Sequence, residues 1–405
     1  MSAVKLVWGV VFRLSYLQVN REKMLKIAVG HSNDPDSLEA VNEVLEQCQV
    51  SLAGEKPKAG LLFAALDFDR LSILQRINEV FPNIELIGGT TDGEVSSVLE
   101  FQQDSLTLML FCSDEMEIRA AVGRDVSQNP CGIAQRTVEE AKSRLTLAPK
   151  LCIAIPESLT TSVSTIVRGL QLGLGDIPIC GGATADQLRV KQTYQFFKTE
   201  VLSDSVPILL FAGNLLFSHG IASGWRPIGK RSLVTKVEAN TIYEIDGKPA
   251  LDFYSYYLND FTPDVAYPLA FFPPDETQYI LRGSVSHDPV LGSITLLGDV
   301  PEHSTVQITD ASLEDIILAS QTSYVDALSS YPGKEPVAAL FFSCAWRRIV
   351  MGTRTHEEYS AIAQNSKVPI VNCGFYTYGE IAPLEMSGQT FFHNTTFVTV
   401  LLGSR

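Results

Sequence analysis

Three segments of the chain repeat one local pattern, in which an apolar strand runs into a loop of glycines, hydroxyl or aromatic side chains and a carboxylate. The segments are 85–94, 177–186 and 371–383; about 93 residues separate the first copy from the second, and roughly twice that separates the second from the third. A repeat of such long period indicates that a whole folding unit has been copied. Glycine lets a ligand approach the main chain closely, so we predict that the three loops form the functional region.

The segments that flank each loop are repeated as well. Before each loop we predict an apolar strand and then a helix, and after each loop a further apolar strand. The predicted ranges are 60–66, 70–80 and 105–111; 151–155, 161–172 and 206–211; and 337–343, 356–365 and 396–402. Strands joined as hairpins and interrupted by single helices favour an α+β fold. We therefore expect mixed, largely antiparallel sheets with helices packed on their faces, built from internally repeated strand–helix–strand–loop–strand units.

The balance of residues excludes several classes of partner. The 405 residues are 45% hydrophobic and 19% charged, as in ordinary globular proteins, and the net charge is −15. Nucleic-acid binding needs clustered Lys and Arg, and no apolar run reaches the ~18 residues of a membrane helix. We expect binding to neither nucleic acid nor membranes.

The cysteines indicate the cellular compartment of the protein, and the first residues indicate where its fold begins. Seven cysteines are scattered without a CxxC pair or metal-ligand spacing, which favours reduced thiols in a cytoplasmic protein and no metal site. Residues 1–20 are apolar enough to suggest a signal peptide, but Arg13 interrupts the run and no cleavage site follows. Because Met24 precedes a natural first strand, we expect residues 1–23 to be a leader that is disordered or absent from the native protein.

A change in composition indicates where the chain divides. A predicted helix at 250–258 leads into a segment that holds Pro263, Pro268, Pro273 and Pro274. Proline interrupts both helices and sheets. We place an amino-terminal domain at 24–259 and a carboxy-terminal domain at 260–405.

Cys344 and Arg347 follow the end of a predicted buried strand. Arginine offers a planar fork that suits a carboxylate or phosphate; the alternative is a structural ion pair with Glu357 or Glu358. A cysteine acts as a nucleophile when a nearby base lowers its pKa. No Cys/His or Ser/His/Asp spacing is visible, so we favour packing or ligand contact for Cys344.

Two histidines are candidates for cofactor or ligand contact. His393 lies between aromatic residues and Asn394, where an imidazole could ligate haem iron or bind a ligand carboxylate. A structural histidine bonded to the backbone is an equal alternative, and His219 is a weaker candidate of the same kind. There is no HExxH, Walker loop, zinc pattern or CxxCH, and the glycine pairs do not form GxGxxG. We expect no metal and no cofactor, with haem on His393 or His219 as the alternative.

We predict that Glu94, Asp186 and Glu380 occupy similar positions in the three loops. Such carboxylates can perform acid–base chemistry, cap helices or hold a ligand ammonium group. Combined with Arg347 in one cleft, they would suit a zwitterion such as an amino acid. The predicted ligand-binding residues are Thr90, Thr91, Glu94, Asp186, Arg282, Cys344, Arg347, Tyr376, Tyr378, Glu380, His393 and Asn394.

Several of these motifs resemble the FIST family, the F-box and intracellular signal transduction proteins. The resembling runs are Gly88–Glu94, Cys344-x-x-Arg347, Gly374–Ile381 (GFYTYGEI) and Phe392-His393-Asn394-x-Thr396, with shorter matches at 218–220, 246–250 and 281–283. GFYTYGE is the specific part, whereas the Gly-Gly loops alone would be weak. The resemblance covers about residues 27–400, with the amino-terminal FIST domain (FIST_N) ending near Asn259 and the carboxy-terminal one (FIST_C) following.

The resemblance implies a cytoplasmic sensory module that binds small ligands such as amino acids. Family members often accompany kinase, chemotaxis or cyclic-di-nucleotide output domains, and some resemble haem-based nitric oxide sensors that work with a separate histidine kinase. No F-box or output domain is recognised in this sequence, so the expected partner is a separate signalling protein such as a histidine kinase or a cyclic-di-nucleotide enzyme.

We therefore favour a small-ligand sensor in signal transduction over two alternatives. The first alternative is a haem-based nitric oxide sensor, and the second is a Cys- or carboxylate-dependent enzyme built on Cys344 and Glu380. No complete catalytic constellation is visible, so we predict that the protein is not an enzyme.

Overall fold

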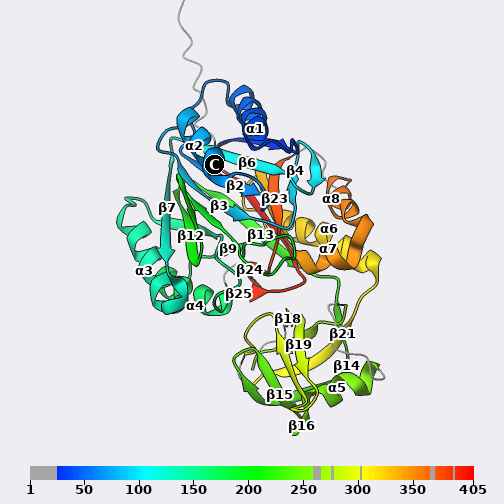
Figure 1. The fold of residues 1–405 in the computed structure, drawn as a ribbon. Helices are drawn as coiled ribbons and strands as arrows, with labels where there is room; N and C mark the ends of the chain where they lie inside the picture. Colours follow the sequence, from blue (N-terminus) through cyan, green and yellow to red (C-terminus); the bar gives the residue numbers. More distant parts are fainter. Residues whose placement is uncertain (1–24, 259–265, 275–277, 302, 365–369, 386–387) are drawn as a thin grey trace, which may run out of the picture.

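The structure is a computed structural model that describes residues 25–258, 266–274, 278–301, 303–364, 370–385 and 388–405. Three six-stranded sheets lie together in the upper part of Figure 1, with helices around them, and a separate sheet with one helix lies below. In the described residues most neighbouring strands are antiparallel, and three pairs are parallel. The expected α+β class is confirmed. The expected leader at residues 1–23 lies outside the described residues.

Each of the three sheets belongs to one copy of the repeated unit, which is longer than the sequence pattern indicated. A unit runs strand, helix, strand, helix, strand, hairpin, strand. The first unit consists of β1 (Lys26–Ser32), α1 (Ser37–Leu52), β2 (Ala59–Ala64), α2 (Arg70–Val80), β3 (Glu85–Thr90), β4 (Glu94–Ser96), β5 (Glu100–Gln102) and β6 (Leu106–Cys112). The second consists of β7 (Met116–Arg124), α3 (Pro130–Ser143), β8 (Pro149–Ala154), α4 (Val163–Leu174), β9 (Ile179–Gly182), β10 (Gln195–Phe197), β11 (Glu200–Leu202) and β12 (Ser205–Gly213).

The third unit is interrupted after its first strand by an inserted sheet. The unit itself consists of β13 (Leu216–Ala222), α6 (Leu313–Ser329), β22 (Ala338–Cys344), α7 (Ala345–Met351), α8 (His356–Ala363), β23 (Val371–Thr377), β24 (Glu380–Pro383), β25 (Thr390–His393) and β26 (Phe397–Gly403). The insertion consists of β14 (Arg226–Glu238), β15 (Thr241–Ile245), β16 (Lys248–Pro249), α5 (Ala250–Leu258), β17 (Leu269–Phe272), β18 (Ile280–Arg282), β19 (Ser284–Asp288), β20 (Ser293–Leu296) and β21 (Thr305–Asp310).

The short hairpin of each unit is exchanged into the sheet of another unit. Hairpin β4–β5 of the first unit pairs with β23 of the third, β10–β11 of the second pairs with β3 of the first, and β24–β25 of the third pairs with β9 of the second. The exchange is cyclic, so the three sheets share one strand order: β1-β6-β2-β3-β10-β11, β7-β12-β8-β9-β24-β25 and β13-β26-β22-β23-β4-β5. Because of it, none of the three units completes its sheet alone.

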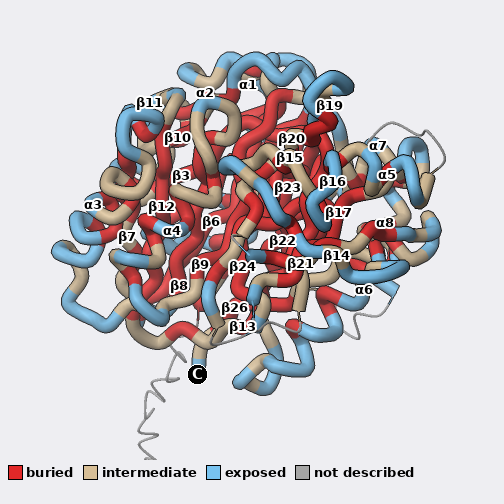
Figure 2. The backbone as a smooth tube through the Cα atoms, turned by 90° about the horizontal axis from the view of Figure 1, so that it is seen from below, coloured by how far each residue is buried: buried red, intermediate tan, exposed pale blue. Residues whose placement is uncertain are grey.

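The central strands are buried on both faces. One apolar cluster joins all three sheets and includes Phe63, Phe211 and Phe342. On the other face, each sheet packs on its own helices, as with α1 and α2 on the first sheet and α3 and α4 on the second. Figure 2 shows this as a buried interior of strands with exposed helix surfaces around it. Continuous apolar runs, rather than alternating ones, are expected of strands covered in this way.

Helix ends are fixed by local side-chain bonds. Asp36 caps α1 by accepting from the amides of Leu38 and Glu39, and Ser162 caps α4 by accepting from the amide of Thr165. Ser312 and Asp315 form a reciprocal capping box at α6. These bonds satisfy amides that the first helical turn leaves unpaired. The cap at Ser162 sets where α4 begins.

One glycine in each unit is required by the close approach of two parallel strands. A Cβ at Gly88 would lie 1.8 Å from the carbonyl oxygen of Leu62, and one at Gly374 would lie 2.1 Å from that of Phe341. Gly181 meets the Ala154 oxygen in the same way, at 2.0 Å. The repeated glycines therefore serve packing between strands, because no side chain fits there.

The inserted sheet spans the junction that we expected between two domains. Its strands β14 and β15 precede residue 259 and β17 to β21 follow it, yet all belong to one eight-stranded sheet with its own apolar core. Arg226 pairs with Asp310, so the insertion leaves and re-enters the third unit at neighbouring points. Residue 259 itself lies outside the described residues. In the described part of the chain, no helix is both long and apolar enough to cross a bilayer.

Candidate functional site

The three predicted loops meet through their backbones. The amide of Asp92 donates to the Tyr376 carbonyl at 3.0 Å, linking the first loop to the third. The amide of Ala185 donates to the Thr90 carbonyl at 2.8 Å, and a further bond joins the third loop to the second. The expected convergence of the loops is therefore present, but they pack against one another in the interior.

A buried polar cluster recurs at the first residue of each exchanged hairpin, β4–β5, β10–β11 and β24–β25. In the third unit, Glu380 accepts from the Thr377 hydroxyl at 2.6 Å and from the Thr396 hydroxyl at 2.7 Å. In the first unit, Glu94 accepts from Thr91 and Ser105 in the same manner. Each carboxyl thus fastens its loop to the strand that follows the hairpin.

The second unit corrects our alignment of the loops. Gln195, not Asp186, stands at the position of Glu94 and Glu380, because Gln195 pairs with Gly89 as Glu380 pairs with Gly182. Its amide group contacts the Thr184 hydroxyl at 2.9 Å and the Ser205 hydroxyl at 3.0 Å. The second loop is longer than the other two, since β9 ends at Gly182 and its hairpin begins at Gln195. Asp186 therefore lies within the loop and not at the repeated position.

Burial changes the proton affinity of the two repeated glutamates. Desolvation raises the pKa of Glu94 to about 8 and that of Glu380 to about 7, against the opposing effect of their hydroxyl partners. Both side chains are fully buried. A carboxyl group in such a place favours its neutral form, and the neutral amide of Gln195 at the third position agrees with this.

Asp186 and Tyr378 form a second polar contact between loops. The Tyr378 hydroxyl donates to Asp186 at 2.5 Å, and the amides of Val190, Lys191 and Gln192 donate to the same carboxylate. These bonds hold the 186–192 segment against the third loop. Thr90 is similarly engaged, since its hydroxyl accepts from the Tyr194 amide at 3.0 Å.

Arg347 is buried and bonded entirely within the protein. Its Nε donates to Glu358 at 2.9 Å, and its other nitrogens donate to Glu358 and to the carbonyls of Ser223, Ile316 and Thr395. Glu358 also accepts from Tyr376 at 2.6 Å. The structural ion pair that we kept as an alternative for Arg347 is therefore present.

Cys344 lies next to this network without access to solvent. Burial and the nearby Glu380 carboxyl raise the pKa of its thiol well above the usual value. A thiol in that state is a poor nucleophile. All seven cysteines are free.

The two candidate haem ligands are also committed to backbone contacts. His393 Nε2 lies 2.9 Å from the Ala382 carbonyl oxygen, and His219 Nε2 lies 2.9 Å from that of Pro383. Each Nε2 must carry its proton to make such a bond, so the lone pair of each neutral ring lies on Nδ1, which in His219 is buried without a hydrogen-bond partner among the described residues. His393 is 1% exposed and His219 4%, and Asn394 next to His393 is fully buried, so both rings are enclosed by the protein. Among the described residues no group of three or more metal-ligating side chains occurs.

An ion pair that we did not predict joins the first loop to the third unit. Arg348 contacts both carboxylate oxygens of Asp92 at 2.9 Å. Desolvation nevertheless raises the pKa of Asp92 to about 6. The sequence signal was present in the doubled Arg347-Arg348, of which we assigned only the first residue.

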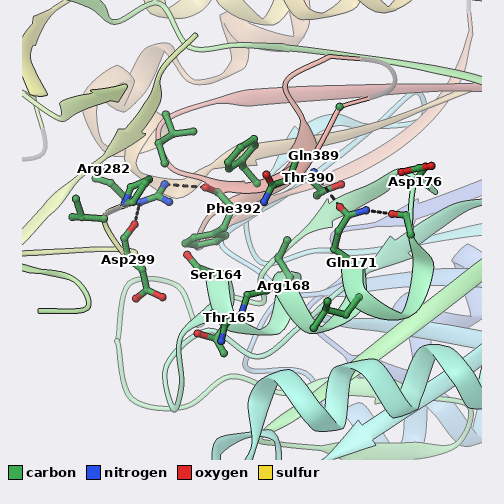
Figure 3. Close-up of a pocket in the computed structure, with 18 residues that line it drawn as sticks. Ser164, Thr165, Arg168, Gln171, Asp176, Arg282, Asp299, Gln389, Thr390 and Phe392 are labelled. Carbon is green, nitrogen blue, oxygen red and sulfur yellow. Dashed lines mark hydrogen bonds between the residues drawn. The ribbon is translucent and has the colours of Figure 1, made fainter. Parts of the chain in front are cut away.

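A cleft of about 630 Å³ lies between α4 of the second unit and the inserted sheet. Its walls come from α4, from β18 and residues 299–301 of the insertion, and from residues 388–392 of the third unit (Figure 3). Of the twelve predicted ligand-binding residues, Arg282 is the one that lines it. The other eleven lie in the loops and core described above.

The cleft carries charges of both signs. Arg168 on α4 and Asp176 just beyond its end are exposed, and neither has an ion-pair or hydrogen-bond partner in the described residues. Arg282 is 2% exposed and forms the wall near the start of α4. Burial lowers the pKa of Arg282 to about 10, so it remains a cation at neutral pH. A polar ligand with separated charges can be accommodated here.

Sequence reasoning missed most of the cleft because its residues come from three distant segments. Ser164, Arg168 and Gln171 belong to a helix that we assigned only by its apolar residues. Arg282 was recognisable as a charge within an apolar strand. An arginine on the outer face of α4 gives no comparable signal, because charged outer faces are usual for helices.

These features define a three-unit α+β protein with a polar cleft beside an inserted sheet. The chain belongs to the FIST family: the FIST N domain model matches residues 58–248 and the FIST C domain model matches residues 250–383. FIST domains are sensory domains of signal transduction rather than enzymes.

Curated relatives and one solved structure are similar to this chain. An uncharacterised protein of Mycobacterium bovis is 24% identical over 92% of this chain and 97% of its own length. One of Methanocaldococcus jannaschii is 28% identical over 52% of this chain and 44% of its own. Cyanuric acid hydrolase from A. caulinodans covers 94% of this chain and 99% of its own at 9% identity and a TM-score of 0.40, which does not establish a common fold.

Proposed function

We propose that the protein is a cytoplasmic sensor whose small ligand, an amino acid or a similar metabolite, binds in the cleft between α4 and the inserted sheet. The observation that supports this most directly is the cleft itself, which is of the size of small-molecule sites and is lined by residues from separate parts of the chain. Family membership supports the sensory role.

The position of the cleft suits a conformational response. Its two walls belong to the three-unit body and to the inserted sheet, which are joined by the β13–β14 and β21–α6 connections. A ligand that contacts both walls stabilises one arrangement of the two parts over others, and only such differential binding shifts a population. The surface of the inserted sheet then differs between the free and bound states.

The receiver of this signal is proposed to be a separate protein, such as a histidine kinase or a cyclic-di-nucleotide enzyme. Membership in a family of sensory signal-transduction domains supports the proposal. Haem is not part of this proposal, because His219 and His393 are buried and each holds a backbone carbonyl through Nε2; the purified protein should show no Soret band after incubation with haemin.

Thermal unfolding with a panel of amino acids and related metabolites tests ligand binding. A ligand at 100 times its Kd stabilises the folded protein by about 2.7 kcal/mol. Arg168→Trp should fill the cleft and abolish the shift. Gln75→Trp is the matched control, because Gln75 is the exposed sixth residue of α2 as Arg168 is of α4. A ligand whose effect survives Arg168→Trp binds elsewhere and contradicts the proposal.

A further inference from the structure

Arg282 is a buried cation that forms no ion pair among the described residues, although the Asp299 carboxylate lies close enough to act on it electrostatically. Its side chain is 2% exposed, and no carboxylate of the described residues lies within 4.0 Å of it. Its Nε donates to the Asp299 carbonyl at 3.0 Å, and its Nη1 donates to the carbonyls of Leu281 at 3.0 Å and Phe392 at 2.9 Å. Since burying a charge is costly unless it is paired, this environment favours an anion from outside the chain.

One nitrogen of Arg282 is left for such an anion. Nη2 donates to no acceptor in the described part of the chain, and it remains accessible to solvent. Ser164 Oγ, on the second residue of α4, is a buried hydroxyl with no hydrogen-bond partner in that same part. Both residues line the cleft and each carries an unused donor, although Ser164 Oγ is itself covered from solvent.

These donors lie at the same end of the cleft. Arg282 bonds to the backbone of Asp299, whose side chain accepts from Ser162 Oγ, the cap of α4, at 2.7 Å. Figure 3 shows Arg282, Asp299 and Ser164 near one end of the cleft and Asp176 at the other. The amino end of α4 adds a partial positive charge there, and Arg168 stands one turn further along the helix.

The guanidinium is held in place by its neighbours. The Phe392 ring lies 5.7 Å from the Arg282 guanidinium carbon, and a Cβ at Gly298 would come within 3.0 Å of Arg282 Nε. Phe392 in turn fills the space beside Gly379, where a Cβ would lie 2.2 Å from the ring. A donor fixed in this way loses little freedom when it binds, which favours affinity.

We propose that this end of the cleft is a carboxylate-binding subsite, in which Arg282 Nη2 and Ser164 Oγ donate to the carboxylate of the ligand. The inference rests on the proposed function, because it names the chemical group by which the cleft ligand is recognised. A carboxylate suits the site better than a phosphate, since few donors are free and the Asp299 side chain nearby disfavours a dianion.

The test compares each carboxylate with its own amide: propionate with propionamide, L-alanine with L-alaninamide, and succinate with succinamide, with inorganic phosphate alongside. Titration calorimetry and thermal unfolding of the full chain measure binding. We expect at least one carboxylate to bind about tenfold or more tightly than its amide, a difference within the range of a charge-assisted hydrogen bond, and phosphate to bind less well.

Two variants connect this preference to the named donors. Ser164→Ala removes a hydroxyl that no described residue uses, so folding should be unchanged, and Arg282→Lys keeps the charge but not the planar donor. Each should weaken carboxylate binding about tenfold and leave amide binding as it was. Leu71→Ala, at the second position of α2 as Ser164 is of α4, is the control.

The outcomes separate this inference from the proposed function. If a ligand is displaced by Arg168→Trp but binds equally well as the amide, or binds Ser164→Ala and Arg282→Lys as tightly as the wild type, the carboxylate subsite is wrong and the sensory cleft stands. If no compound of either panel binds the wild type, both proposals are wrong.

Discussion

Arg347 illustrates how a single buried charge can look functional in sequence and be structural in the fold. An arginine that follows a buried strand gives the same sequence pattern whether it binds a ligand or forms a structural ion pair. Only the structure shows that Glu358, three carbonyls and Tyr376 form one closed network around it. Breaking a buried pair is costly because the remaining charge keeps no partner.

Arg347→Met should therefore destabilise the protein by about 3–5 kcal/mol, measured by urea unfolding at neutral pH. The double variant Arg347→Met, Glu358→Gln should recover part of the loss, since it leaves no unpaired charge. Arg354→Ala, which removes an exposed partner of Glu314 and Glu357, should unfold like the wild type. A small effect of Arg347→Met would contradict a structural role.

Glu380 leads to a prediction about pH. Its pKa of about 7 in the folded state exceeds the usual 4.5, so between these values the folded state binds more protons than the unfolded state. Stability from this group is then fully present below about pH 4.5 and declines as pH rises towards 7, by up to about 1.4 kcal/mol per pH unit. Glu94, with a pKa of about 8, extends this loss of stability to about pH 8.

Glu380→Gln should flatten this dependence, because the amide cannot ionise. Gln195 shows that an amide fits between the two hydroxyls at the repeated position. Urea unfolding at a series of pH values from 5 to 8 should give a shallower slope for the variant than for the wild type. Identical slopes would mean that Glu380 ionises normally in the folded protein.

At the scale of elements, strands and helices could be predicted well, but their partners could not. Apolar runs and helical stripes are local signals, so β2, α2 and β6 were recognisable from sequence near their observed bounds. The exchange of β4–β5, β10–β11 and β24–β25 between units depends on contacts far apart in the chain. The mistaken equivalence of Asp186 with Glu94 has the same origin, since only strand pairing identifies Gln195.

The candidate site was less predictable than the fold. Glycine loops indicated a ligand, but Gly88, Gly181 and Gly374 are explained by strand packing. The cleft instead combines a helix face, a strand end and residues 388–392, which no repeat in the sequence connects. Arg282 was named because residues 281–283 resemble the FIST family, not because of any local signal for a cleft.

Alanine at these glycines tests the packing explanation. Gly88→Ala and Gly374→Ala should each destabilise the protein by about 1–3 kcal/mol or more, because the new Cβ must displace a strand carbonyl. Gly388→Ala, where the nearest atom would be 3.5 Å away, should be close to neutral. Differential scanning calorimetry measures the three variants, and equal melting temperatures would contradict the packing role.

At the scale of the whole molecule, the exchanged hairpins make the two family-defined halves interdependent. The matches meet between residues 248 and 250, within the inserted sheet. Across that junction, β13 pairs with β26, β4 with β23, and β24 with β9. Each half therefore lacks strands that the other supplies, and both would expose apolar sheet edges if separated.

Fragments 25–249 and 250–405 should consequently fail to fold cooperatively when expressed alone and should form a soluble complex when co-expressed. Excision of the insertion should be tolerated better, although it removes the contacts of Ala270, Phe272 and Leu281 with the third unit. Arg226 and Asp310 pair as neighbours, about 5 Å apart in such a ladder, so a short glycine-serine linker can join β13 to α6. Gel filtration and far-ultraviolet circular dichroism melts compare the three proteins. A cooperative melt of fragment 25–249 alone would show that its sheets do not need the hairpin and strands of the other half. The exchange of hairpins between units would then not be essential for the stability of the molecule.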